Sequence, residues 1–527
     1  MDAPDSHILH ALMNGRRVRH ADRGVRLPAA RPGHRNQPLA VIDIGSNSGR
    51  VAVFERDVAG HLRLVSGVRA PLRLVQDVDR VQHLTEETMA RAIEALREFQ
   101  AIATSAGAVR TIAVATAAMR DAANRRFFLE RVTREIGIPI RILNERQEAR
   151  YGFIGAVRGL PASDGLVFDL GGGSLQVSTF ANRRMGVGVS LPFGALRMSE
   201  TLLESDPPTG KQLHRIREQA RSGFKEARIG RLPTGAQLIG TGGTLRNLAK
   251  IDHESRDYPV RSLHGYELTV ERLNTIVERL ASTRKKHLDG LPGLSTDRAD
   301  SIVGGALVIQ TLARFTRAKS ILVSAHGVRE GLALDALGLA VGSADAAKDA
   351  WLSSLERRFD GGRPDAAARR RTIAAALQRG LEPDAGERLT RAIDRAAQLL
   401  DIGRTVDVVS RHEHGANILV STDITGVRHD DVALTAALMR RAGNRHGAVT
   451  MIGEAIDAGL LNRAAIIVAL AEDIELRCRL GRHITVDCVI DRNVTITVRP
   501  LLSRLGTGLV KRFEQAFGRP LIVRSRP

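Results

Sequence analysis

LAVIDIGSNS, at Leu39–Ser48, and LVFDLGGGS, at Leu166–Ser174, decide the fold of this chain. Each segment is an apolar run of strand type that ends in an aspartate and a turn rich in glycine and serine. Glycine lets a backbone approach a ligand closely, and the N–H groups of such a turn converge on an anion. One turn of this kind after a strand is common. Two copies on either side of a cleft predict a clamp for phosphate.

A third segment, AQLIGTGGT at Ala236–Thr244, repeats the pattern of strand and Gly-rich turn, and a helix is expected from Leu245. In this order of parts the chain resembles the actin-like ATPase superfamily. Within that superfamily it is similar to the exopolyphosphatase and guanosine-pentaphosphate phosphatase family, over Leu39 to Asp335. The segments that carry the resemblance are DIGSNS at Asp43–Ser48, ATAAMRDA at Ala115–Ala122, ERQEAR at Glu145–Arg150, DLGGGS at Asp169–Ser174, GTGGT at Gly240–Thr244, LPGLSTDRAD at Leu291–Asp300 and GVREG at Gly327–Gly331.

The composition favours an anionic ligand. At 527 residues the chain is too long for one core, so roughly two to four domains are expected. The formal net charge of +20 attracts polyanions, although an Arg-rich composition alone explains it equally well. Aromatic residues make up only 3% of the chain, and no nucleic-acid motif is recognisable, so nucleic acid is disfavoured as a partner.

Two cysteines, Cys478 and Cys488, do not form a disulfide framework. The sequence has no apolar run long enough to cross a membrane and no apolar core of a signal peptide near its start. Residues 1–38 are expected to form a flexible basic arm. These features predict a cytoplasmic protein without a membrane partner, and a homodimer stays an open alternative.

Strands that alternate with helices predict an α/β layered fold. In light of the resemblance, residues 39–150 and 151–340 are expected to form two ribonuclease-H-like (actin-like ATPase) domains flanking a cleft. One helix should begin after Thr85, which suits the N-cap position. The predicted strands are 39–44, 50–54, 62–65, 111–115 and 140–143 in the first domain, and 165–170, 175–180, 184–190, 237–239 and 320–324 in the second.

The composition changes near Gly342–Asp349. Residues 346–446 resemble the helical HD-type domain of long family members, and residues 447–527 are expected to form a small α+β region. The metal site of such a domain is degenerate here, because Leu400 stands beside Asp401 where a histidine is needed, and His412 and His414 are too few ligands. The domain is therefore expected to be structural or to bind substrate. A basic track for long polyphosphate would use Arg404, Arg411, Arg440 and Arg441, unless these residues form an ordinary solvated face.

The resemblance also assigns chemistry to single residues. Glu148 matches the general base of the family, although a lone helical Glu usually pairs with a nearby Arg. Arg120 matches an arginine near the phosphate, and the two form the predicted catalytic set. Asp43 and Asp169 would hold Mg²⁺ or its waters, and either one alone could instead cap its own turn. The predicted phosphate-binding residues are Ser46, Asn47, Ser48, Gly171, Gly172, Gly173, Ser174, Gly242, Gly243 and Thr244.

Gln176 departs from the family pattern, which places a glutamate two residues after GGGS. The glutamine keeps the shape of the side chain and loses its charge, so this third metal position is weakened. Val75 is a second departure, at a place where glycine is usual.

Three functions follow from these residues. The preferred one is Mg²⁺-dependent removal of terminal phosphate from inorganic polyphosphate by direct water attack. Hydrolysis of guanosine pentaphosphate on the same fold is the first alternative. A catalytically weak protein that binds polyphosphate or a guanine nucleotide is the second, and Gln176 favours it.

Overall fold

The structure is a computed structural model that describes residues 37–339, 342–359, 363, 365–445, 456–478, 484–500 and 504–525. Contacts divide the chain into two compact units. Unit 1 comprises Met1–Arg256 and Leu263–Ala350, and unit 2 comprises Asp257–Ser262 and Trp351–Pro527. The predicted basic arm lies outside the described residues except for its last two positions.

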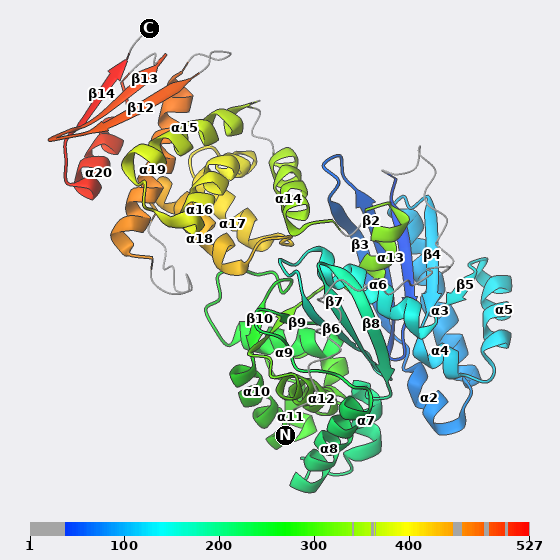
Figure 1. The fold of residues 1–527 in the computed structure, drawn as a ribbon. Coiled ribbons are helices and arrows are strands. Elements are labelled where there is room, and N and C mark those ends of the chain that lie inside the picture. Colours follow the sequence, from blue (N-terminus) through cyan, green and yellow to red (C-terminus); the bar gives the residue numbers. More distant parts are fainter. Residues whose placement is uncertain are drawn as a thin grey trace. The chain divides into compact units, whose positions relative to one another are not determined.

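Unit 1 begins with a five-stranded sheet, which with its helices is called domain I below (Figure 1). Its elements are β1 (Leu39–Ile44), β2 (Ser48–Arg56), β3 (Leu62–Pro71), α2 (Leu74–Val81), α3 (Glu86–Ser105), β4 (Arg110–Ala115), α4 (Ala117–Asp121), α5 (Arg125–Ile136) and β5 (Ile140–Ile142). The strand order is β3-β2-β1-β4-β5, with β3, β2 and β1 antiparallel and β1, β4 and β5 parallel. Thr85 caps α3 as predicted, because its hydroxyl accepts a hydrogen bond from the Thr88 N–H at 3.3 Å.

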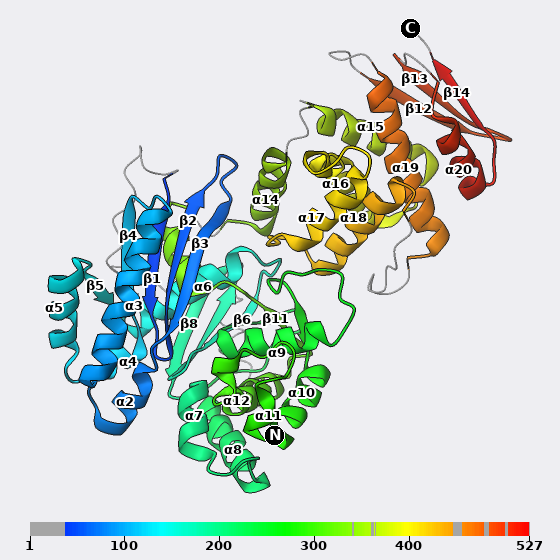
Figure 2. The same cartoon turned by 180° about the vertical axis from the view of Figure 1, so that it is seen from behind.

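Domain II repeats this topology in a second sheet (Figure 2). Its elements are α6 (Glu145–Arg158), β6 (Gly165–Leu170), β7 (Leu175–Ala181), β8 (Arg184–Leu191), α7 (Ala195–Leu202), α8 (Gly210–Glu226), β9 (Gln237–Thr241), α9 (Gly243–Glu254), β10 (Glu267–Thr269), α10 (Val270–Ser282), α11 (Lys285–Leu288), η2 (Thr296–Arg298), α12 (Ile302–Phe315), β11 (Ser320–Val323) and α13 (Val328–Ala336). The order β8-β7-β6-β9-β11 matches that of domain I, and β10 adds an antiparallel edge. All ten predicted strands of the two domains are confirmed.

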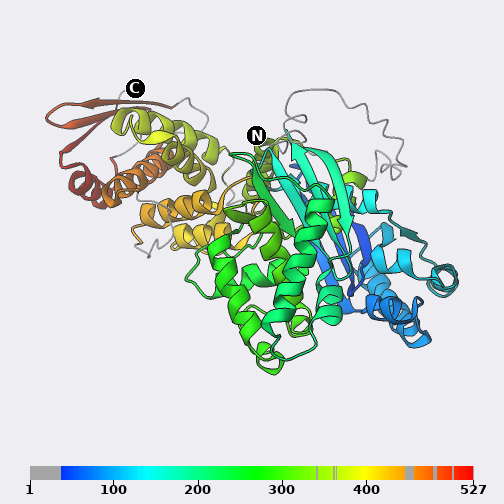
Figure 3. The same cartoon turned by 60° about the horizontal axis from the view of Figure 1, so that its bottom comes forward.

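Helices α6 and α13 lie between the two sheets (Figure 1). They cross at glycines, where a side chain would not fit. A Cβ on Gly155 would lie 2.0 Å from the Gly327 carbonyl oxygen, and one on Gly331 would lie 1.9 Å from that of Tyr151. This close approach fixes α6 and α13 against each other beneath the phosphate turns. Most of the remaining helices of domain II, green in Figure 3, lie on the face of its sheet opposite to α6.

Unit 2 is mainly helical and ends in a three-stranded sheet of order β12-β13-β14. Its elements are the end of α14 (Ala344–Arg358), α15 (Ala366–Leu381), α16 (Gly386–Leu399), η3 (Ile402–Thr405), α17 (Arg411–Ser421), α18 (His429–Ala442), α19 (Ala458–Arg477), β12 (Thr485–Ile490), β13 (Val494–Arg499), α20 (Thr507–Phe517) and β14 (Leu521–Ser525). A single hydrophobic core joins Trp351, Leu470 and Phe513. This core runs across the expected boundary at 446, because α19 packs on α15, α16 and α18.

Candidate active site

The two predicted phosphate turns have the same local structure. The Gly45 N–H donates to the Ser48 carbonyl at 3.1 Å, and the Gly171 N–H donates to that of Ser174 at 2.9 Å. Each turn follows a strand whose last residue but one is an aspartate, Asp43 in β1 and Asp169 in β6. Because β1 and β6 occupy equivalent places in the two sheets, the turns meet across the domain boundary.

The glycines of the second turn lie close to residues of the first turn. A Cβ added to Gly172 would lie 3.2 Å from the Cβ of Asn47, and one on Gly173 would lie 3.4 Å from the Ser46 hydroxyl. The two turns are therefore within about one side-chain contact of each other. The two turns thus face each other, as the prediction of a phosphate clamp requires.

The third turn joins the same site from the end of β9. Gly242 has a φ of +107°, and a Cβ there would lie 2.3 Å from the Leu170 carbonyl oxygen. Helix α9 starts directly afterwards, so its N-terminal N–H groups favour an anion. The Thr244 hydroxyl is buried in the first turn of α9 and has no hydrogen-bond partner among the described residues.

These three turns enclose a cavity of about 130 Å³. All the predicted phosphate-binding residues line this cavity except Thr244. The lining residues are Asp43, Gly45, Ser46, Asn47, Ser48, Arg50, Thr116, Glu148, Asp169, Leu170, Gly171, Gly172, Gly173, Ser174, Gln176, Thr241, Gly242, Gly243, Arg246, Arg298, Gly327, Val328, Arg329 and Glu330.

Four carboxyl groups line this cavity, and burial raises the pKa of three of them, Glu148, Asp169 and Asp43. Burial raises the pKa of Glu148 to about 7. The nearby Arg120 lowers this pKa, whereas Asp169 and Asp43 raise it. Burial likewise raises the pKa of Asp169 to about 6, in part against Arg246, and raises that of Asp43. A carboxylate that ionises near neutral pH in a phosphate site has the properties of a general base.

Arg120 reaches the site only through Glu148. Its Nη1 donates to Glu148 Oε2 at 2.6 Å and to the Leu143 carbonyl at 2.8 Å, and the Arg120 side chain does not line the cavity. The predicted contact between Arg120 and phosphate is therefore not what the structure shows. The guanidinium instead fixes the orientation of the Glu148 carboxylate.

Gln176 also contacts Glu148. Its Nε2 donates to the Ser174 hydroxyl at 2.8 Å and to Glu148 Oε1 at 3.3 Å, and only 4% of the residue is exposed. The amide thus holds one carboxylate oxygen of Glu148 while Arg120 holds the other. In the part of the chain that the structure describes, no three His, Cys, Asp or Glu side chains converge as a metal site would require.

The aspartates nevertheless suit a divalent cation. Asp43 Oδ1 is buried without a hydrogen-bond partner among the described residues, which is costly for an acceptor unless a ligand satisfies it. Magnesium usually takes one or two protein carboxylates and completes its shell with phosphate oxygens and water. Asp43 and Asp169 fit that pattern, and Gln176 is not needed for it.

Four arginines of the cavity were missed by the sequence reasoning: Arg50, Arg246, Arg298 and Arg329. Burial and their mutual repulsion lower the pKa of Arg50 and Arg246, and lower that of Arg298 to about 10. Arginines crowded in this way are stabilised by a polyanion. Two of the four carried a sequence signal, because Arg298 and Arg329 lie inside the LPGLSTDRAD and GVREG segments.

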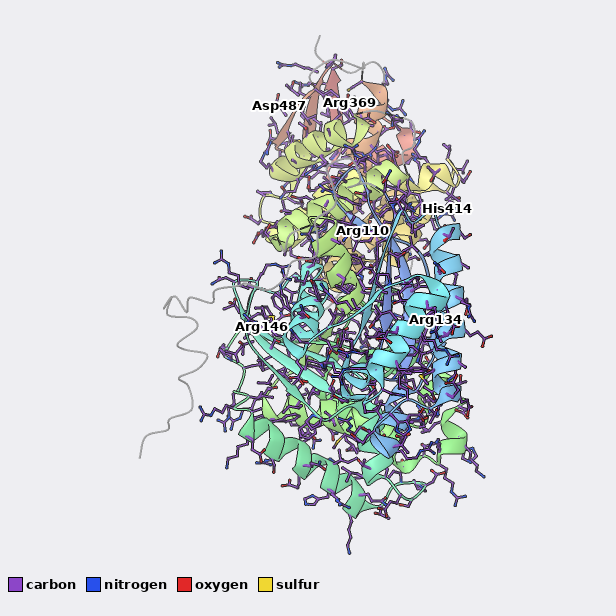
Figure 4. All side chains as sticks on the ribbon, turned by 90° about the vertical axis from the view of Figure 1, so that its right-hand side faces the viewer. Arg110, Arg134, Arg146, Arg369, His414 and Asp487 are labelled. Atoms are coloured by element: carbon purple, nitrogen blue, oxygen red, sulfur yellow. The ribbon has the colours of Figure 1, made fainter. Side chains whose placement is uncertain are left out.

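Outside the cavity, positive charge is spread over the surface. Arg134 on α5 and Arg146 on α6 are exposed (Figure 4).

No helix among the described residues is both long and apolar enough to cross a bilayer.

The predicted basic track of unit 2 is only partly available. Arg411 donates two hydrogen bonds to Glu472 Oε1, at 3.0 and 2.8 Å, and His412 contacts Glu472 Oε2 at 2.7 Å. Burial by itself would raise the pKa of Glu472, but His412 and Arg411 together lower this pKa to about 2. Arg411 is therefore paired with a buried carboxylate in this structure, which opposes its predicted role in a basic track.

The other track residues are less constrained. Arg404 lies 3.5 Å from Asp401, and Arg440 donates to the Asn417 side chain at 2.9 Å. The Arg441 Nε is buried without a partner among the described residues. Asp401 itself is paired at 2.9 Å with the fully buried Arg370, so its carboxylate already has a cationic partner.

We expect Arg411→Gln to destabilise unit 2 by ~2 kcal/mol. Removing one partner of a buried ion pair typically costs about 3–5 kcal/mol, and His412 retains part of that interaction. Thermal unfolding gives the measurement, with Arg391→Gln as the control because its partner Glu387 is exposed. An equal and small effect of both changes would show that Glu472 does not depend on Arg411.

Paired ribonuclease-H-like domains with two phosphate turns define the actin-like ATPase class of fold. The chain belongs to the Ppx/GppA phosphatase family, whose model matches residues 53–340. It is accordingly a phosphoanhydride hydrolase. Unit 2 lies largely outside that match.

Known proteins resemble the same part of the chain. Exopolyphosphatase 1 of Mycobacterium tuberculosis (strain ATCC 25618 / H37Rv) is 31% identical over 300 residues, which cover 56% of this chain and 87% of that protein. Exopolyphosphatase 2 of the same strain is 29% identical over 315 residues, covering 57% and 98%. The crystal structure of the Aquifex aeolicus Ppx/GppA family member is 26% identical, with a TM-score of 0.51 over 57% of this chain and 98% of that one.

Proposed function

We propose that this protein removes terminal phosphate from inorganic polyphosphate by direct attack of water. The observation that carries the proposal is the position of Glu148, a carboxyl with a pKa of about 7 that faces a cavity between two phosphate turns. The names of the two mycobacterial relatives support the same substrate.

In this proposal Glu148 accepts a proton from the attacking water, while Arg120 and Gln176 hold its two oxygens in place. The turn N–H groups and the serine hydroxyls bind the terminal phosphoryl group, and the four cavity arginines bind its neighbours along the chain. Asp43 and Asp169 would hold Mg²⁺, which neutralises charge on the transferred phosphoryl group. No covalent intermediate is required.

The lining of the cavity favours polyphosphate over guanosine pentaphosphate. None of the described residues that line it is aromatic, whereas a nucleobase is usually bound by stacking on an aromatic side chain. The comparison of kcat/KM for long polyphosphate and guanosine pentaphosphate tests this preference. A higher value for the nucleotide would transfer the proposal to the alternative substrate.

We further propose that Arg404, Arg440 and Arg441 assist long chains through charge. Such contacts release counterions, so affinity should fall steeply with salt. A cytoplasmic location and a homodimer stay predictions.

Gln176→Glu is expected to make turnover depend more steeply on Mg²⁺. The new carboxylate would lie beside Glu148, so it repels that group in the absence of a cation and adds a ligand in its presence. Turnover measured against Mg²⁺ concentration should be lower than wild type at low Mg²⁺ and equal or higher at saturation. Superimposable curves would show that a charge at this position has no effect on turnover.

A further inference from the structure

Helix α2 of domain I contacts domain II on three of its residues. Gln76 donates to Glu200 at 2.7 Å, and Asp79 accepts two hydrogen bonds from Arg197, at 2.7 and 3.0 Å. The side chain of Val75 is 1% exposed and lies under the second phosphate turn, where a Cβ on Gly173 would be 3.5 Å from its Cγ2. The helix therefore spans the domain boundary.

The start of α2 is attached to the first phosphate turn. The N–H groups of Leu72 and Arg73 both donate to the Asn47 carbonyl at 2.9 Å, and that of Val75 donates to the Ser46 carbonyl at 3.0 Å. Any displacement of α2 thus displaces the two residues that face the second turn.

Arg197 is attached to the second phosphate turn in the same way. Its N–H donates to the Gly172 carbonyl at 3.2 Å, next to that of Leu196 at 3.0 Å. Its side chain makes the two bonds to Asp79. The connections therefore form a closed ring, from the first turn through α2 and Arg197 to the second turn.

We propose that the Asp79–Arg197 pair is a positioning contact that sets the spacing of the two phosphate turns. The ring formed by the two turns, α2 and Arg197 is called the α2 clasp below. The inference rests on the proposed function, since it concerns binding of phosphate at that site. Neither Asp79 nor Arg197 lines the cavity, so neither can act on the substrate directly.

Opening the clasp should lower the fraction of molecules whose turns are close enough to bind phosphate together. The apparent affinity falls by that fraction, whereas the bound complex still reacts in the same geometry. The clasp therefore predicts an increase in KM with little change in kcat. A residue with a general structural role would lower the amount of folded protein and leave KM unchanged.

The test uses the single changes Arg197→Asp and Asp79→Arg and the double exchange of the two charges. With tripolyphosphate as substrate, each single change should raise KM by about fivefold and alter kcat by less than about twofold. The double exchange should restore most of the affinity. The control is Asp394→Arg, which breaks a similarly bidentate pair with Arg371 in unit 2, at 2.7 and 2.9 Å.

Two further measurements do not depend on turnover. Hydrogen exchange of residues 45–48 and 171–174 should accelerate in both single variants and return in the double exchange. Calorimetric binding of tripolyphosphate should weaken in parallel. If wild-type protein binds tripolyphosphate without hydrolysing it, the proposed function fails while these measurements still report on the clasp. Unchanged binding and exchange in the single variants, or a double variant as weak as either single one, would overturn the inference.

Discussion

Replacing Glu148 with alanine is expected to lower the turnover of polyphosphate by about a hundredfold to ten-thousandfold. The carboxyl is the one group of the cavity that combines a pKa near neutral with two fixed hydrogen bonds to its oxygens. Arg120 and Gln176 would remain in place, so the alanine variant should still bind substrate. Phosphate release and calorimetric binding, measured on the same preparation, separate the two effects.

The matched control is Glu145→Ala, an exposed carboxylate in the same first turn of α6. It should retain normal turnover, since it faces solvent. The pH profile gives a second control. A base must be ionised to accept a proton, so wild-type activity should fall as the pH drops below about 7. Near-normal turnover in a folded Glu148→Ala protein would remove this residue from the mechanism.

Asp169→Asn should have opposite effects on activity and stability. Turnover is expected to fall by about a hundredfold or more, because the variant loses one of the two carboxylates that would hold Mg²⁺. The metal-free protein should nevertheless become more stable at pH 8. Burial raises the pKa of Asp169 from 3.8 to about 6, so the ionised form is disfavoured in the folded state.

The sign follows from linkage. The folded protein holds the Asp169 proton more tightly than the unfolded chain, so stability is lost as the pH rises from about 4 to about 6. About two pKa units correspond to about 3 kcal/mol, which asparagine should recover at most. Thermal unfolding in the presence of a chelator, at pH 4 and pH 8, measures this difference. A variant less stable than wild type at pH 8 would show that the ionised carboxylate is satisfied within the fold.

The sequence predicted the two sheets because their strands and turns carry local signals. Strand, aspartate and Gly-rich turn occur together at Asp43 and at Asp169, and both turns are found facing each other. Thr85 was identified as an N-cap for a similar reason, since its signal lies within four residues.

Features that depend on distant residues were not predictable in this way. Arg50 and Arg246 look like ordinary surface arginines in the sequence, and only the meeting of four segments turns them into cavity residues. Arg120 and Arg411 were assigned to substrate, whereas each is bound by a carboxylate from elsewhere in the chain. The packing of α19 is likewise not apparent in the sequence, because its buried face is defined only once α15, α16 and α18 surround it.

Hydrolysis of long polyphosphate in ¹⁸O-labelled water, followed by ³¹P NMR, tests the central claim most directly. The account predicts that orthophosphate carrying one ¹⁸O atom accumulates while the chain ends persist, because the oxygen of water is transferred to the terminal phosphorus and not to the remaining chain. The same experiment with Glu148→Ala should show binding and almost no release. Wild-type protein that binds polyphosphate but releases no orthophosphate, or that cuts chains internally, would contradict the assignment of this cavity to terminal phosphate hydrolysis.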